Sequence, residues 1–175
     1  MILIIAYGND LREDDGAGLM LAEQLASVLP DRGLAVQLIS VQQLAPELAA
    51  DIAGENVTVV VFVDTRMTTS PIDRNVAVVP LEPGTELSPS MGHHVQPAVL
   101  LAYAQALYVP EAAPPAWLVT VPGIRFGYGE FISDVALSAI REALEDDGSQ
   151  LRRLVANLSL VACIPKPTTN GTARS

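Results

Sequence analysis

Residues 57–64 read Val-Thr-Val-Val-Val-Phe-Val-Asp, the most hydrophobic stretch of this 175-residue chain. Its apolar residues follow one another almost without interruption, a pattern typical of a strand that is buried on both faces of a parallel sheet. Residues 2–6, Ile-Leu-Ile-Ile-Ala, show the same pattern at the start of the chain. Strands of this kind need helices on both faces of their sheet, so the chain is predicted to be an α/β protein.

Helix and strand patterns alternate around these two segments. Apolar spacing and turn residues predict helices over residues 15–29, 46–53, 96–108 and 133–144, and further strands over 35–41, 75–80 and 117–121. The connection before strand 75–80 has only about ten residues, too few for a helical crossover, so this strand should run antiparallel to its predecessor. Residues 150–164 fit a helix in their first part and a strand in their last. The predicted fold is a three-layer α/β/α sandwich with a five-stranded, mostly parallel, twisted sheet that contains one antiparallel strand.

Length, charge and cysteine content narrow the classes of function. The length suits one domain, predicted to span residues 1–164, followed by a flexible tail over 165–175. With 20 acidic against 10 basic residues the formal net charge is −10, which argues against nucleic acid and membrane surfaces as partners. The lone cysteine, Cys163, permits no internal disulfide and no cysteine-rich zinc site. The N-terminal residues lack the positive region of a signal peptide, so a cytoplasmic location is expected.

Polar residues gather where the predicted strands end. Asp14 and Asp15 follow the first strand, Asp64 follows the central strand, and His93 and His94, the only histidines, precede a predicted helix. In open α/β sheets, binding sites form beyond the carboxyl ends of the strands. Two carboxylates and an imidazole that converge there would suit a divalent metal of borderline softness, nickel or zinc before magnesium.

Each of these residues also has a purely structural interpretation. Asp14 and Asp15 could cap the following helix and complement its dipole, and the histidine pair could be a solvated helix cap. Asp64 is harder to explain in this way, because a carboxylate at the end of a buried strand must be solvated or paired. The glycine-rich residues 122–129 are expected to form a turn rather than a phosphate cradle, and no nucleophile elbow, dinucleotide-binding motif or P-loop occurs.

Residues 8–18, Gly-Asn-Asp-Leu-Arg-Glu-Asp-Asp-Gly-Ala-Gly, resemble the opening signature of the [NiFe]-hydrogenase maturation endopeptidases. That signature is Gly-Asn-x-Leu-x-x-Asp, followed by an acidic residue and a glycine-containing helix start. Residues 63–65, Val-Asp-Thr, are similar to the family's strand-ending aspartate, and His94 is similar to its histidine before the third helix. Residues 126–133 resemble the family's entry to the last helix. In order and spacing, the resemblance extends over nearly the whole chain.

The resemblance implies an endopeptidase with aspartyl-type activity and the same α/β/α fold. Enzymes of this family remove a short C-terminal extension from the nickel-loaded precursor of a [NiFe]-hydrogenase large subunit. Carried over by motif, Asp15 and Asp64 would be the catalytic residues, and the metal contacts would be Asp15, Asp64 and His94, with His93 as the alternative. The nickel would be supplied by the active site of the substrate rather than held stably by the enzyme. A monomer is expected.

Some positions depart from the family pattern, and other interpretations stay open. Residues 91–94, Met-Gly-His-His, stand where the family often has Ser-x-His, and Asp15 replaces a frequent glutamate. A catalytically silent relative that binds nickel or the precursor as a chaperone would carry the same motifs. A signalling receiver domain would need a lysine at the end of the fifth strand, where residues 120–122 read Thr-Val-Pro instead. A small-molecule-binding α/β domain is the generic interpretation.

Overall fold

The computed structural model describes residues 1–70, 72–84, 95–108 and 113–161, which build a five-stranded sheet in the order β2-β1-β3-β5-β4. The strands are β1 (Ile2–Tyr7), β2 (Val36–Val41), β3 (Val59–Met67), β4 (Ala77–Leu81) and β5 (Ala116–Gly123). β1, β2, β3 and β5 run parallel, and β4 pairs antiparallel with β5 at one edge. The prediction of a mostly parallel sheet with one antiparallel strand is confirmed.

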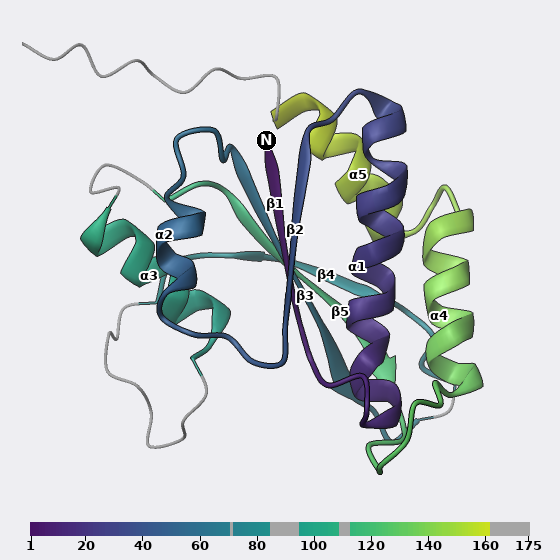
Figure 1. Cartoon of the computed structure of the whole chain (residues 1–175). Coiled ribbons are helices and arrows are strands. Elements are labelled where there is room, and N and C mark those ends of the chain that lie inside the picture. The colour runs from purple at the N-terminus through teal and green to yellow at the C-terminus, as the bar shows by residue number, and fades with distance from the viewer. Residues whose placement is uncertain (71, 85–94, 109–112, 162–175) are drawn as a thin grey trace, which may run out of the picture.

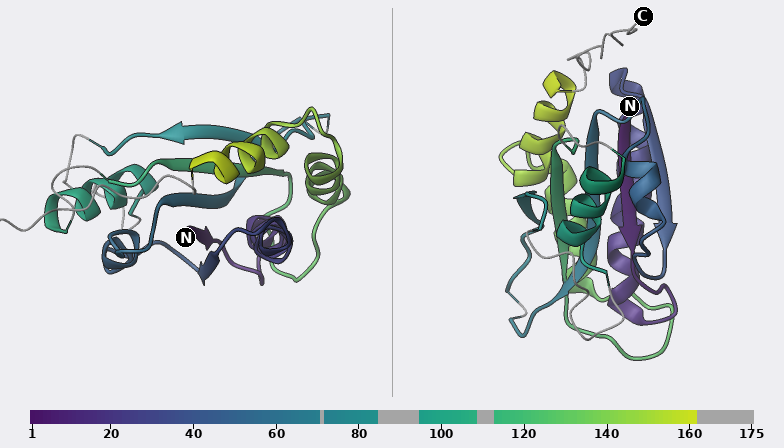
Figure 2. Two further views of the ribbon diagram at one scale, coloured as in Figure 1. Left: turned by 90° about the horizontal axis from the view of Figure 1, so that it is seen from above. Right: turned by 90° about the vertical axis from the view of Figure 1, so that its left-hand side faces the viewer.

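Helices cover both faces of the sheet, as Figures 1 and 2 show. On one face lie α1 (Ala17–Val28), α4 (Asp134–Glu145) and α5 (Gln150–Val161), and on the other lie α2 (Leu48–Ile52) and α3 (Pro97–Leu107). Two short 3₁₀ turns, η1 (Glu13–Gly16) and η2 (Pro30–Arg32), flank α1. This arrangement is the predicted three-layer α/β/α sandwich.

A separate hydrophobic core lies on each face of the sheet. Successive residues of β3 alternate between them: Val61 and Val63 belong to the core under α1, α4 and α5, whereas Val60 and Phe62 belong to the core under α2 and α3. None of these side chains is more than 2% exposed. The uninterrupted apolar run of the sequence follows from this arrangement, because a strand with helices on both faces has no exposed side.

The structure differs from the sequence-based prediction at one edge of the sheet, in the length of β3 and in the last helix. β4 runs antiparallel to β3 as predicted but pairs with β5, because β1 and β5 already occupy both edges of β3. β3 continues to Met67, so Asp64 lies inside the strand, where it pairs with Thr120, instead of ending it. The ambiguous residues from 150 onward form the helix α5 as far as Val161.

Some predictions concern residues outside the described ranges. His93 and His94 lie there, as do Cys163 and the tail expected over residues 165–175. Within the described ranges, no helix combines the length and the apolar character needed to cross a membrane.

Candidate active site

The carboxyl end of β1 lies beside Asp64 of β3, which brings two polar side chains together on one face of the sheet. Tyr7 is the last residue of β1, and Asp64 lies one step beyond the register pair Ala6–Val63. Because side chains alternate along a strand, Tyr7 and Asp64 both continue the rows that pack under α2 and α3. The Tyr7 phenol and the Asp64 carboxylate lie close enough for each to shift the pKa of the other. This pair lies at the edge where open α/β sheets form their binding sites.

Asp15 reaches the same place from η1, the turn that connects β1 to α1. Its Oδ2 atom accepts a hydrogen bond of 2.9 Å from the backbone N–H of Asn9. Gly8 makes this turn possible, because its φ is +149° and a Cβ there would collide with the carbonyl oxygen of Asp15. Asp15 is half-buried, and its charge acts on Asp64. The two carboxylates predicted from the sequence therefore lie close together.

The first turn of α1 packs directly against β3 beside Asp64. The N–H of Gly18 donates a hydrogen bond of 2.9 Å to Oγ1 of Thr65, whose side chain points to the opposite face of the sheet from Asp64. A Cβ on Gly18 would lie 2.8 Å from the carbonyl carbon of Asp64. The helix approaches this closely only because residue 18 has no side chain. The backbone of Asp64 is thereby held between the neighbouring strands and the helix.

Burial sets the protonation behaviour of Asp64 and Tyr7. It raises the pKa of Asp64 from 3.8 to about 6, and the nearby charge of Asp15 adds to the rise. Hydrogen bonds from the backbone N–H of Thr65, at 2.7 Å, and from Tyr7 act in the opposite direction and lower the pKa of Asp64. Burial, followed by the charge of Asp64, raises the pKa of the Tyr7 phenol above its ordinary value. Tyr7 is therefore a protonated hydrogen-bond donor at neutral pH.

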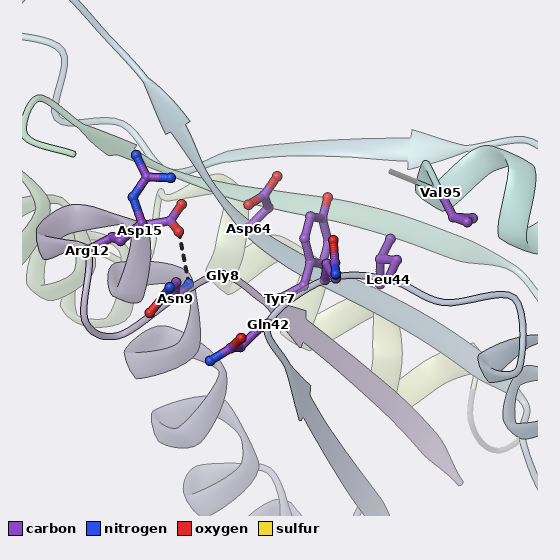
Figure 3. A pocket seen from close by; sticks show the side chains of 10 residues that line it. Tyr7, Gly8, Asn9, Arg12, Asp15, Gln42, Leu44, Asp64 and Val95 are labelled. Atoms are coloured by element: carbon purple, nitrogen blue, oxygen red, sulfur yellow. Dashed lines mark hydrogen bonds between the residues drawn. The ribbon is translucent and has the colours of Figure 1, made fainter. Parts of the chain in front are cut away.

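These side chains line an open pocket with a volume of about 440 Å³. Figure 3 shows the carboxylates of Asp15 and Asp64 and the hydroxyl of Tyr7 projecting to the same side of it. The rest of the lining comes from the loops after β1 and β2 and from the segment before α3: Gly8, Asn9, Arg12, Gln42, Gln43, Leu44 and Val95. The pocket thus combines a carboxylate pair, the cationic side chain of Arg12, uncharged hydrogen-bonding groups and a small apolar wall.

Asp14 has a structural role and lies outside the pocket. It is fully buried, and its carboxylate accepts hydrogen bonds from the backbone N–H groups of Ile124, Arg125 and Ser133 and from the Ser133 hydroxyl. Ser133 is the predicted cap of α4 and accepts a hydrogen bond from the N–H of Ala136 at 3.3 Å. Asp14 therefore joins η1 to the loop between β5 and α4. The alternative that Asp14 caps the following helix is wrong, because no side chain caps α1.

Only some of the residues that were predicted to bind a metal belong to the described part of the chain. Among the described residues, no group of three or more histidine, cysteine, aspartate and glutamate side chains could hold a metal ion. His93 and His94 lie outside these residues, but Val95, the next residue in the sequence, lines the pocket. The chemistry of the two carboxylates fits a divalent cation, because a positive charge would offset both the burial of Asp64 and its repulsion from Asp15.

Tyr7, Arg12 and the two glutamines after β2 line the pocket, although no role was predicted for them from the sequence. Tyr7 ends an apolar strand, where an aromatic side chain is expected to join the core, and only the parallel register shows that it meets Asp64. Both glutamines reach the pocket because β2 lies beside β1, a strand order that apolar patterns do not reveal. Arg12 could have been predicted as a site residue, because it lies within the motif at residues 8–18.

The same fold occurs in solved structures of hydrogenase maturation proteases. The hydrogenase maturating endopeptidase HybD from E. coli superposes with a TM-score of 0.63 at 18% sequence identity, covering 91% of this chain and 92% of that chain. The [NiFe] hydrogenase maturation protease HybD from Thermococcus kodakarensis gives 0.53 at 21% identity, covering 82% and 94%. A hydrogenase 2 maturation peptidase from a Thaumarchaeota archaeon gives 0.56 at 19% identity, covering 91% and 98%.

No family model and no curated protein matches the sequence. At the identities of the solved structures, the likeness establishes the fold. The chain has the α/β/α fold of the hydrogenase maturation proteases over most of its length, which confirms at the level of fold the resemblance seen in the sequence motifs.

Proposed function

We propose that this chain is an endopeptidase that removes a short C-terminal extension from the nickel-loaded precursor of a [NiFe]-hydrogenase large subunit. The observation that carries the proposal is the meeting of Asp15 and Asp64 in one open pocket. Both residues belong to the motifs that resemble the family, and the fold is that of proteins named as hydrogenase maturation proteases. Fold, motif and pocket chemistry thus support the same function.

In this proposal Asp15, Asp64 and His94, with His93 as the alternative, contact the nickel of the substrate. Carboxylate and imidazole groups suit nickel, a cation of intermediate softness. When bound, the metal would supply positive charge that polarises the scissile carbonyl group or a water molecule. The position of Val95 in the pocket wall supports a histidine contributed by the residues just before it.

The residues of the chain itself supply the acid–base chemistry. In the metal-free chain the pKa of Asp64 is about 6. Contact with the nickel of the substrate would lower this pKa and keep the carboxylate ionised, the form that accepts a proton. The N–H of Thr65 holds the Asp64 carboxylate by a hydrogen bond, and the N–H of Asn9 holds the Asp15 carboxylate in the same way. Peptide hydrolysis needs such a base, because the attacking water loses a proton and the leaving amine gains one.

The proposal is tested in a strain that lacks the gene for this chain. Mass spectrometry measures the intact hydrogenase large subunit in the deletion strain and after wild type, Asp15→Asn or Asp31→Asn is added back. Asp31 is an exposed carboxylate at the far end of α1 from the pocket and serves as the matched control. Wild type and Asp31→Asn should remove the extension, whereas the deletion strain and Asp15→Asn should retain it.

Other outcomes would point to a different function. A large subunit that is trimmed normally in the deletion strain would refute a protease for this substrate. A silent chaperone would bind the purified nickel-loaded precursor without shortening it. The same mass measurement, made on purified precursor mixed with purified wild type, separates the chaperone from the protease.

A further inference from the structure

Beside the pocket, two loops present apolar side chains to solvent. The exposed fractions are 96% for Tyr128, 59% for Phe131, 53% for Leu11 and 40% for Ile124. These four residues form what we call the loop patch. Leu11 lies in the loop after β1, and the other three lie between β5 and α4. Exposed apolar groups that gather near a binding site are typical of surfaces that bind another protein.

Hydrogen bonds between the two loops hold the loop patch in place. The N–H of Glu13 donates a hydrogen bond of 2.7 Å to the carbonyl oxygen of Gly129. The N–H of Gly129 donates one of 2.9 Å to the carbonyl oxygen of Leu11. The Glu13 carboxylate accepts hydrogen bonds from the N–H of Gly127 at 2.8 Å and from the Arg125 guanidinium at 2.9 Å. A fixed backbone therefore displays the apolar side chains, and a partner would not have to order these loops on binding.

The loop patch is continuous with the candidate active site. Arg12, the neighbour of Leu11, lines the pocket, and its guanidinium donates a hydrogen bond of 3.1 Å to the carbonyl oxygen of Phe126 in the second loop. On its buried side, Asp14 fastens the second loop to η1. The views in Figures 1 and 2 place both loops together at the carboxyl edge of the sheet. A protein bound to the loop patch would have its chain within reach of the pocket.

The charges around the loop patch indicate the chemistry of the partner. Arg125 is paired with Glu13, so its charge is offset. Asp10 and Glu130 are exposed, and within the described part of the chain neither forms an ion pair. Arg12 also forms no ion pair within the described part of the chain, so Asp10, Glu130 and Arg12 together leave one net negative charge on these loops. A net negative charge attracts a basic surface. A second copy of this chain, with its formal net charge of −10, would be repelled.

We propose that the loop patch is the docking surface for the folded body of the large-subunit precursor, where it contacts an apolar area bordered by lysine or arginine side chains. The inference rests on the proposed function and adds to it a binding surface outside the catalytic pocket. Aromatic side chains carry much of the binding energy of interfaces, so Tyr128 and Phe131 are the expected anchors. Docking here would hold the precursor while its C-terminal segment enters the pocket.

The test compares binding and turnover of the purified nickel-loaded precursor. Biolayer interferometry gives the Kd, and mass spectrometry gives kcat and KM, for wild type, for the double variant Tyr128→Ala/Phe131→Ala and for Tyr108→Ala. Tyr108 is a tyrosine with 54% exposure at the end of α3 and serves as the matched control. The double variant should raise Kd and KM by roughly tenfold or more while kcat at saturating precursor is unchanged. Tyr108→Ala should behave as wild type.

Each other outcome decides against the docking surface. If wild type trims the precursor and the double variant matches it in Kd and KM, the docking surface is refuted and the proposed function stands. If wild type neither binds nor trims the precursor, both fail. If light scattering shows a wild-type dimer that the double variant lacks, with precursor affinity unchanged, the loop patch serves self-association instead.

Discussion

Asp14 and Asp15 are neighbours in the sequence with opposite surroundings. Asp14 is fully buried among backbone and hydroxyl donors of the loop after β5, whereas Asp15 is half-buried and faces an open pocket. Composition and spacing alone could not separate their roles, because both lie in one acidic run before a predicted helix, and only the resemblance to a family motif singled out Asp15. What separates them is the loop before α4, which is distant in the sequence and supplies donors to Asp14 but not to Asp15.

The first prediction concerns this pair of aspartates. Asp14→Asn should lower the free energy of unfolding by about 3 kcal/mol, because the new amide NH₂ group would face N–H donors in a buried site. Asp15→Asn should change it by less than about 1 kcal/mol, because a half-buried side chain at a pocket contributes little to the core. Urea denaturation at pH 7, monitored by circular dichroism, measures the free energy of unfolding of both variants. Equal losses would contradict the assignment of a structural and a functional aspartate.

The second prediction concerns Asp64 and pH. Its pKa is about 6 in the folded protein, against an ordinary value of 3.8, so the folded state binds this proton more tightly than the unfolded chain does. The stabilisation from this proton is fully present below about pH 4 and is lost as the pH rises through about 6. At about 1.4 kcal/mol for each pKa unit, the loss at high pH amounts to at most about 3 kcal/mol.

Asp64→Asn, which cannot ionise, should therefore be more stable than wild type at pH 8 by roughly 1–3 kcal/mol. Near pH 4 the two proteins should have similar stability, because Asp64 is then protonated in wild type as well. Urea denaturation at the two pH values gives the comparison. A variant less stable than wild type at pH 8 would mean that the Asp64 carboxylate is needed for the fold.

At the scale of elements, burial explains which parts could be predicted. β1 and β3 are buried on both faces and were visible in the sequence as apolar runs, whereas the partner of β4 depends on which strands already flank β3. Residues 150–161 were ambiguous because their apolar spacing suited a helix in one part and a strand in another. They form the helix α5, which packs against α4 and β4. Periodicity therefore predicts what an element is more reliably than which elements it contacts.

The third prediction concerns the contact between α1 and β3. Inside a helix, alanine is more favourable than glycine by about 1 kcal/mol, so Gly18→Ala would normally stabilise α1. Here the new Cβ would lie 2.8 Å from the carbonyl carbon of Asp64, a backbone atom that cannot move aside easily. We expect the clash to prevail and the free energy of unfolding to fall by about 2 kcal/mol.

Gly148→Ala is the control for this change. A Cβ at Gly148 would meet a side-chain oxygen of Asp146 at 3.3 Å, and this flexible side chain can turn away. Urea denaturation should therefore show a change of less than about 1 kcal/mol for Gly148→Ala. An increase in stability for Gly18→Ala would mean that α1 can move away from β3 at little cost.

At the scale of the whole molecule, the site depends on topology more than on motif. The motifs drew attention to Asp15 and Asp64, but their meeting follows from the order β2-β1-β3, which sets the end of β1 beside Asp64 of β3. The same order brings Tyr7 and the end of β2 into the pocket, and no local pattern marked either of them. The monomeric state and the cytoplasmic location stay predictions from the sequence.

The fourth prediction addresses how the whole molecule binds nickel and which histidine takes part. Because the described residues bring only Asp15 and Asp64 to the pocket as carboxylate donors, the isolated chain should bind Ni²⁺ weakly, though more tightly than Mg²⁺. Isothermal titration should show this binding lost in Asp15→Asn and in His94→Ala and kept in His93→Ala. The reverse result for the two histidine variants would assign the contact to His93. If both histidine variants bind Ni²⁺ as tightly as wild type, no histidine is a ligand. The chain should then not prefer Ni²⁺ over Mg²⁺.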